Sequence, residues 1–156
     1  RALVNDPDIV FLDEPTTGLD PQARHLIWDR LRQLTGRGKT LILTTHFMDE
    51  AERLCDRLAV IDHGRIVTEG APRELIATHI EPQVVEVFGD QAAAWAKERS
   101  GLGERLEVAG DTAFFYCRDT APLLAALVNE PVLRYMHRAA TLEDVFIKLT
   151  GRELRD

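Results

Sequence analysis

Two neighbouring carboxylates, Asp13 and Glu14, directly follow the strand-like segment Asp8–Leu12. A short apolar run of this kind is typical of a strand buried on both faces of a parallel sheet. Open α/β sheets bind ligands at the carboxyl ends of their strands, where these two acids lie. In a nucleotide triphosphatase, one such carboxylate holds Mg²⁺, usually through water, and its neighbour orients or deprotonates the attacking water. By themselves, two acids here more often mark only the point where the chain leaves the core.

The segments around these acids alternate between strand-like and helix-like patterns. The elements predicted in chain order are a strand at 8–12, a helix at 20–35, a strand at 39–44, a helix at 48–55, a hairpin at 58–68 and a helix at 72–78. Asp20 followed by Pro21 is typical of a helix N-cap and first helical residue. The helix at 20–35 is expected to turn Ile27, Leu31 and Leu34 to one face. This alternation predicts an α/β fold with a parallel sheet.

The composition changes after Pro82, and a second pattern begins. Its predicted elements are strands at 84–88, 105–109, 112–117 and 133–137, with helices at 90–99 and 122–129. The order β-α-β-β-α-β matches a ferredoxin-like module. A last helix is predicted to start with a capping box of Thr141 and Asp144 and to stop at Gly151. We therefore expect two domains, residues 1–78 and residues 79–156, the second a small α+β domain.

The charge balance of the 156 residues narrows the classes of partner. The chain has 19 Lys and Arg against 26 Asp and Glu, a net charge of −7, and its basic residues are spread along the sequence. This pattern argues against direct binding to nucleic acid or to an anionic membrane. No apolar run approaches the roughly 18 residues of a spanning helix, so we expect the chain itself to be cytoplasmic. Cys55 and Cys117 lie in apolar surroundings without metal-ligand spacing, which favours free buried thiols.

Three segments together resemble a known family. The pair Asp13-Glu14, the following Pro15–Asp20 and the later Thr44–His46 are similar to the C-terminal half of the ATP-binding subunit of ABC transporters. The resemblance implies the C-terminal half of a P-loop, RecA-like ATPase core. It also implies that ATP and Mg²⁺ are bound by the intact protein, and that two such subunits close on ATP as a dimer.

The resemblance assigns a role to individual residues. Asp13 matches the Walker B aspartate that holds Mg²⁺ through water, and Glu14 matches the catalytic base. His46 matches the switch histidine, which reaches the γ-phosphate. Thr17–Asp20 match the D-loop, which contacts the partner subunit. The candidate catalytic residues are thus Glu14 and His46, and the candidate cofactor-binding residues are Asp13 and Asp20; as an N-cap, Asp20 needs no partner subunit at all.

The likeness extends through the second half of the chain. Residues 141–154 look like the end of the accessory domain of ABC-2-type exporter ATPases, and residues 23–28 and 50–57 look most like the nodulation-type exporters of lipo-chitin oligosaccharides, with drug-resistance exporters as relatives. This subgroup implies a separate integral-membrane permease as partner. It also implies a peripheral position at the cytoplasmic face of the membrane. The charges of residues 49–53 are predicted to form a solvated helix face.

Two motifs of the family are missing from the 156 residues. There is no GxxxxGK[ST] phosphate-binding loop and no LSGGQ-like signature, and the chain begins at Arg1, so we expect the tail of a longer protein. Residues 1–3 resemble the end of the helix that follows the signature loop. The chain alone is expected to be inactive toward ATP. We also expect a bare edge and a bare apolar face on the strands at 9–12 and 39–44, and hence self-association.

Two other functions stay open on the residues alone. One is a non-enzymatic regulatory or dimerisation module, in which the core remnant only supports residues 80–156. The other is a soluble, non-transport ABC ATPase of the DNA-repair or translation type. The acidic balance and the exporter-like C-terminal segment argue against the latter.

Overall fold

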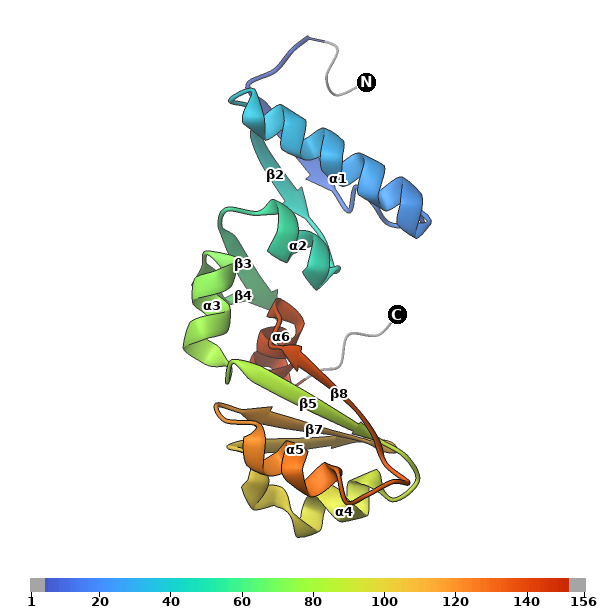
Figure 1. The fold of residues 1–156 in the computed structure, drawn as a ribbon. Helices are drawn as coiled ribbons and strands as arrows, with labels where there is room; N and C mark the ends of the chain where they lie inside the picture. Colours follow the sequence, from blue (N-terminus) through green and yellow to red (C-terminus); the bar gives the residue numbers. More distant parts are fainter. Residues whose placement is uncertain (1–4, 152–156) are drawn as a thin grey trace. The chain divides into compact units, whose positions relative to one another are not determined.

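The computed structural model describes residues 5–151, which form two compact units. The first comprises the described residues up to Pro72, and the second is Arg73–Gly151 (Figure 1). This division falls at the start of a helix, whereas the sequence predicts a domain boundary after Thr78, which stays a prediction. The expected resemblance of residues 1–3 lies outside the described residues. Within residues 5–151, no helix combines the length and apolar character that crossing a membrane requires.

The first unit contains, in chain order, β1 (Ile9–Asp13), α1 (Pro21–Gly36), β2 (Thr40–Thr44), α2 (Met48–Leu54), β3 (Leu58–Asp62) and β4 (Arg65–Gly70). β1 and β2 pair in parallel, with Ile9 opposite Thr40 and Asp13 opposite Thr44. β3 and β4 form the predicted antiparallel hairpin. Its turn holds His63 and Gly64 at φ of 47° and 72°, the left-handed region that two-residue hairpin turns use. The α/β alternation is therefore confirmed.

The parallel pair is covered on one face only. α1 packs against β2, and Val10 is only 4% exposed. Because side chains alternate along a strand, the next residues point to the other face. There, Phe11 is 73%, Ile9 54% and Ile42 48% exposed. The prediction of strands buried on both faces is thus wrong for the described residues, and the prediction of a bare apolar face is confirmed.

The helix α1 starts at the predicted cap. Asp20 Oδ1 accepts hydrogen bonds from the backbone N–H groups of Gln22 and Ala23, each at 3.0 Å. These bonds satisfy two donors that the first helical turn leaves free. The buried residues of α1 are Trp28, Leu31 and Leu34. Trp28 thus takes the core position predicted for Ile27, which is half-buried.

The second unit contains, in chain order, α3 (Pro72–His79), β5 (Gln83–Phe88), α4 (Ala92–Glu98), a short 3-10 helix (Ser100–Leu102), β6 (Arg105–Ala109), β7 (Thr112–Cys117), α5 (Ala121–Leu127), β8 (Arg134–Ala139) and α6 (Leu142–Thr150). The sheet order is β6-β7-β5-β8, and all neighbours are antiparallel. This is the strand order of a ferredoxin-like module, so the expected α+β fold is confirmed.

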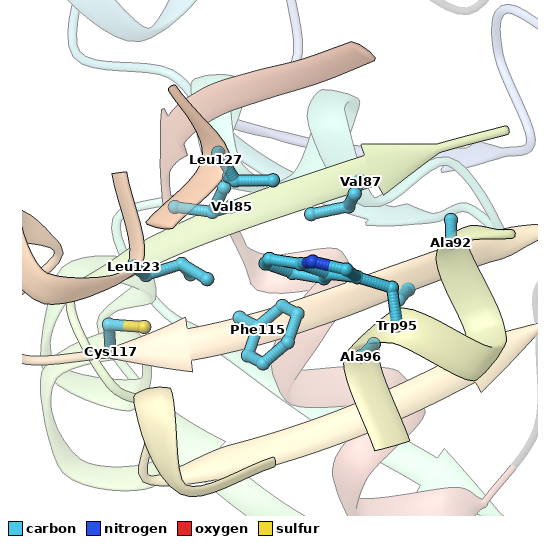
Figure 2. Close-up of a cluster of buried hydrophobic side chains, with 10 residues drawn as sticks. Val85, Val87, Ala92, Trp95, Ala96, Phe115, Cys117, Leu123 and Leu127 are labelled. Atoms are coloured by element: carbon cyan, nitrogen blue, oxygen red, sulfur yellow. The ribbon is translucent and has the colours of Figure 1, made fainter. Parts of the chain in front are cut away.

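One face of this sheet carries the hydrophobic core. Its members come from both strands and helices and include Val85 of β5, Phe115 of β7, Trp95 of α4 and Leu123 of α5 (Figure 2). The Trp95 and Phe115 rings meet edge to face, with centroids 6.1 Å apart. Trp95 Nε1 donates to Glu130 Oε1 at 2.8 Å, which satisfies the polar end of a buried indole. α4 and α5 therefore pack on the same side of the sheet.

The opposite face holds α6 through a buried carboxylate. Asp144 accepts two hydrogen bonds from Arg138, at 2.7 and 3.0 Å, and one from the Tyr116 hydroxyl at 3.2 Å. The Thr141 N–H donates to Asp144 Oδ2 at 2.8 Å, as the capping-box pattern predicts. Burial raises the pKa of Asp144, but the bonds from Arg138 and Thr141 outweigh burial and hold it below its usual value. Burial, followed by the charge of Asp144, raises the pKa of Tyr116 to about 12.

Both cysteines are free thiols, as predicted. Cys117 is buried, and burial is the main cause that raises its pKa to about 11. Cys55 is only half-buried, so the expectation of burial is wrong for this residue. Burial, with a smaller contribution from Glu50, also raises the pKa of the Cys55 thiol.

Candidate active site

The parallel register of β1 and β2 brings the predicted catalytic segments to one edge. Asp13 lies opposite Thr44, so the residues that follow each strand emerge side by side. The Glu14 N–H donates to the Thr44 carbonyl at 3.0 Å, which extends the strand pairing by one residue. The Thr44 hydroxyl donates to Asp13 Oδ1. Asp13 is therefore held by its neighbour strand while its carboxylate remains exposed.

Glu14 occupies a backbone conformation that side chains seldom adopt. Its φ is 44°, in the left-handed region, where a residue with a Cβ costs on the order of 1 to 2 kcal/mol. The turn that follows is closed by the Thr17 N–H, which donates to the Glu14 carbonyl at 3.2 Å. The Thr17 hydroxyl donates to Glu14 Oε2 at 3.1 Å. The turn thus orients the carboxylate, and strain of this kind is common at functional sites.

His46 completes the group. Its Nδ1 lies 3.2 Å from Glu14 Oε1, and both side chains are 47% exposed. The imidazole packs on Phe47, with ring centroids 4.1 Å apart. A carboxylate and an imidazole in contact at an accessible edge can take up and return a proton. The structure thus brings together three of the four predicted site residues, Asp13, Glu14 and His46.

Asp20, the fourth predicted residue, has a different environment. The hydrogen bonds that its side chain accepts come from the first turn of α1. These hydrogen bonds show that Asp20 is the N-cap of α1. Its predicted contribution to a cofactor site or to a partner subunit stays a prediction.

The donor set at this edge fits one kind of metal. Among residues 5–151, no group of three or more His, Cys, Asp or Glu side chains is arranged to hold an ion. Asp13 nevertheless offers an exposed carboxylate next to the Thr44 hydroxyl. Mg²⁺ is commonly held by one or two carboxylates, with waters and substrate phosphates as its other ligands. The residues present therefore fit a magnesium ion that arrives with a nucleotide.

The sequence analysis missed one important residue, Glu50. We expected it on a solvated helix face, but it is fully buried, and this prediction is wrong. Its Oε1 accepts hydrogen bonds from the Thr16 hydroxyl at 2.9 Å and from Trp28 Nε1 at 3.0 Å. Helical spacing gives only a partial signal of this, because Glu50 shares one face of α2 with the apolar residues Ala51 and Leu54 but its donors lie on distant segments.

Comparisons with known proteins cover the whole chain. A family model described as the C-terminal domain of the nodulation factor export protein NodI matches residues 92–151, and an AAA domain model matches residues 2–47. The Nod factor export ATP-binding protein I of Cupriavidus metallidurans is 61% identical over all 156 residues, which are 52% of its length. That of Burkholderia orbicola is 59% identical, and the match covers 51% of its length. The chain spans about half the length of these relatives.

The comparison with solved structures gives a partial likeness only. A solved structure from Clostridium perfringens, part of an ABC transporter complex, is 38% identical, with a TM-score of 0.45 over 48% of this chain and 30% of that one. The resemblance predicted from the sequence is confirmed by the full-length similarity to the relatives and by the match of the NodI C-terminal domain model, and not by this structural likeness. Within that class, the chain is similar over its full length to the Nod factor export ATP-binding proteins.

Proposed function

We propose that this chain is the C-terminal part of the ATP-hydrolysing subunit of an ABC-2-type exporter. Residues 1–78 would complete the ATPase core, and residues 79–156 would form an accessory domain. The observation that carries the proposal is the contact of Glu14 with His46 at the strand edge that also presents Asp13. The whole-length similarity to Nod factor export ATP-binding proteins supports the same conclusion.

Each residue of the group has a role in this proposal. Asp13 would hold Mg²⁺, which, when bound, neutralises charge on the phosphates of ATP. Glu14 accepts a proton from the attacking water, since its carboxylate is exposed and its direction is set by Thr17. His46 lies within reach of the same carboxylate. Its imidazole would donate a hydrogen bond toward the γ-phosphate of a bound ATP. Phosphoryl transfer depends mainly on such positioning and charge stabilisation.

The proposal includes two partners. The first is a second ATP-binding subunit, which the segment Thr17–Asp20 would contact. The second is an integral-membrane permease that uses the closure of the two subunits, so that the protein works peripherally at the cytoplasmic face of a membrane. The relatives' name makes a Nod factor the first cargo to test.

The test is ATP hydrolysis by the longer protein that contains this chain. We expect magnesium-dependent hydrolysis by the wild type. Glu14→Gln should lower turnover by roughly 10²- to 10⁴-fold, the range for a positioned general base, and leave ATP binding in place. Asp29→Asn is the matched control, because Asp29 is an exposed carboxylate of α1 that pairs with Arg32. Equal hydrolysis by the wild type and Glu14→Gln would contradict the assignment.

A further inference from the structure

Glu50 is a fully buried carboxylate in the first turn of α2, four residues after His46. Its Oε1 receives the Thr16 hydroxyl at 2.9 Å and the Trp28 indole N–H at 3.0 Å. These donors come from the loop after Glu14 and from α1. A single oxygen of Glu50 therefore connects three segments of the first unit.

The Glu50 carboxylate is held by hydrogen bonds from neutral groups. Both described donors are neutral groups, and Oε2 is buried without a hydrogen-bond partner. The guanidinium of Arg24 stacks on Phe47 and pairs with Asp49 at 3.8 Å. A buried carboxylate is costly unless it is well partnered, so the two neutral donors must be kept in place. Their geometry in turn constrains the segments that carry them.

One of these segments carries the candidate base. Thr16 lies two residues after Glu14, in a loop closed by two backbone bonds: Thr17 N–H to the Glu14 carbonyl and Leu19 N–H to the Thr16 carbonyl, both at 3.2 Å. Thr16 itself is fully buried. Moving its side chain would therefore move the turn that sets the direction of the Glu14 carboxylate.

The segment that carries Glu50 itself also carries the histidine. The His46 ring packs on Phe47, the residue that precedes α2. The Phe47 carbonyl accepts the N–H of Ala51 at 3.2 Å, which joins His46 to the same helical turn as Glu50. Glu50 is thus linked to both members of the Glu14–His46 pair through Thr16 and through the first turn of α2.

We infer that Glu50 is a positioning residue, which holds the Glu14 turn and the His46 segment in register through Thr16. This inference rests on the proposed function, because the pair that Glu50 aligns is the proposed hydrolytic pair. Glu50 acts from inside the fold, since its side chain is fully buried. Its loss should therefore reduce the rate of the chemical step more than the binding of Mg-ATP.

The test compares two substitutions in the longer protein. Glu50→Leu removes the acceptor, and we expect kcat to fall by about 10²-fold, as for a misplaced catalytic group, with KM for Mg-ATP changed by less than about threefold. Glu50→Gln keeps an acceptor oxygen at the same place and should keep kcat within about threefold of the wild type. Asp29→Asn is again the exposed control. Thermal unfolding is measured for every variant.

The outcomes separate the two levels of inference. If Glu14→Gln hydrolyses ATP like the wild type, the proposed function fails, whatever Glu50 does. If Glu14→Gln is inactive but folded Glu50→Leu keeps wild-type kcat, or loses kcat and KM together, the positioning role is overturned. If Glu50→Leu does not fold, Thr16→Val decides: a lower kcat at constant KM supports the role, and a wild-type kcat overturns it.

Discussion

Nδ1 of His46 lies 3.2 Å from Oε1 of Glu14, although the two residues follow different strands. The contact depends on the parallel register that sets Asp13 opposite Thr44, because that register makes both strands end at one edge. The Thr17 hydroxyl donates a hydrogen bond to the second carboxylate oxygen of Glu14, Oε2, at 3.1 Å. The carboxylate is thus held from two sides by residues of the chain itself.

The Glu14–His46 contact predicts that the two residues act as a unit. In the longer protein, we expect Glu14→Gln and His46→Ala each to lower turnover strongly. The double variant should be little worse than the poorer single one, because residues that act together are non-additive. Steady-state ATP hydrolysis by the wild type, the two single variants and the double variant measures the coupling free energy between the two residues. Fully multiplicative losses would show that the two side chains act independently.

The chain alone is predicted not to bind Mg-ATP. The 156 residues include no GxxxxGK[ST] loop, and the charge-assisted hydrogen bonds of such a loop are worth roughly 1.5 to 3 kcal/mol each. The exposed carboxylates of Asp13 and Glu14 repel a triphosphate. Titration calorimetry should show no binding heat, with the longer protein as the positive control. Micromolar binding by the chain would refute this prediction.

The bare face of β1 and β2 predicts self-association of the chain. Phe11 is 73% exposed beside Ile9 and Ile42, and unpaired apolar sheet surface promotes association. Phe11→Ser should shift the chain toward monomer. Val128→Ser is the control, since Val128 is 75% exposed in the second unit. Light scattering after size exclusion measures the mass, and a strictly monomeric wild-type chain would contradict the prediction.

The depressed pKa of Asp144 predicts acid sensitivity of the second unit. Burial raises this pKa, but the hydrogen bonds from Arg138 and Thr141 lower it by more, so that it stays below its usual value. The stability that Asp144 contributes is therefore present above the unfolded pKa and is lost as pH falls through the folded one, over the range from about pH 5 downward. Asp144→Asn should lower the free energy of unfolding by about 2 kcal/mol at neutral pH. It should also make the free energy of unfolding less dependent on pH in the acid range.

Urea unfolding of the full chain at a series of pH values measures this effect. Asp90→Asn serves as the control, because Asp90 is an exposed carboxylate of the same unit. It should leave both the free energy of unfolding and its pH dependence close to those of the wild type. Parallel acid curves for wild type and Asp144→Asn would rule out the stabilising role of the ion pair.

The element order was predictable because its signals are local. The Asp20-Pro21 cap, the turn at His63-Gly64 and the capping box of Thr141 with Asp144 each depend on residues close in sequence. The order of strands and helices predicted for residues 84–137 was also enough to predict the ferredoxin-like sheet, since few topologies satisfy that order.

The sequence by itself singled out Asp13, Glu14 and His46, because the segments that carry them together resemble the C-terminal half of ABC transporter ATP-binding subunits. Only the tertiary structure decided that Glu14 and His46 touch, since that contact needs the register of two strands separated by a helix. It also decided that Glu50 is buried. The charge of a side chain favours solvent, and only donors supplied by distant segments, here Thr16 and Trp28, can outweigh that preference.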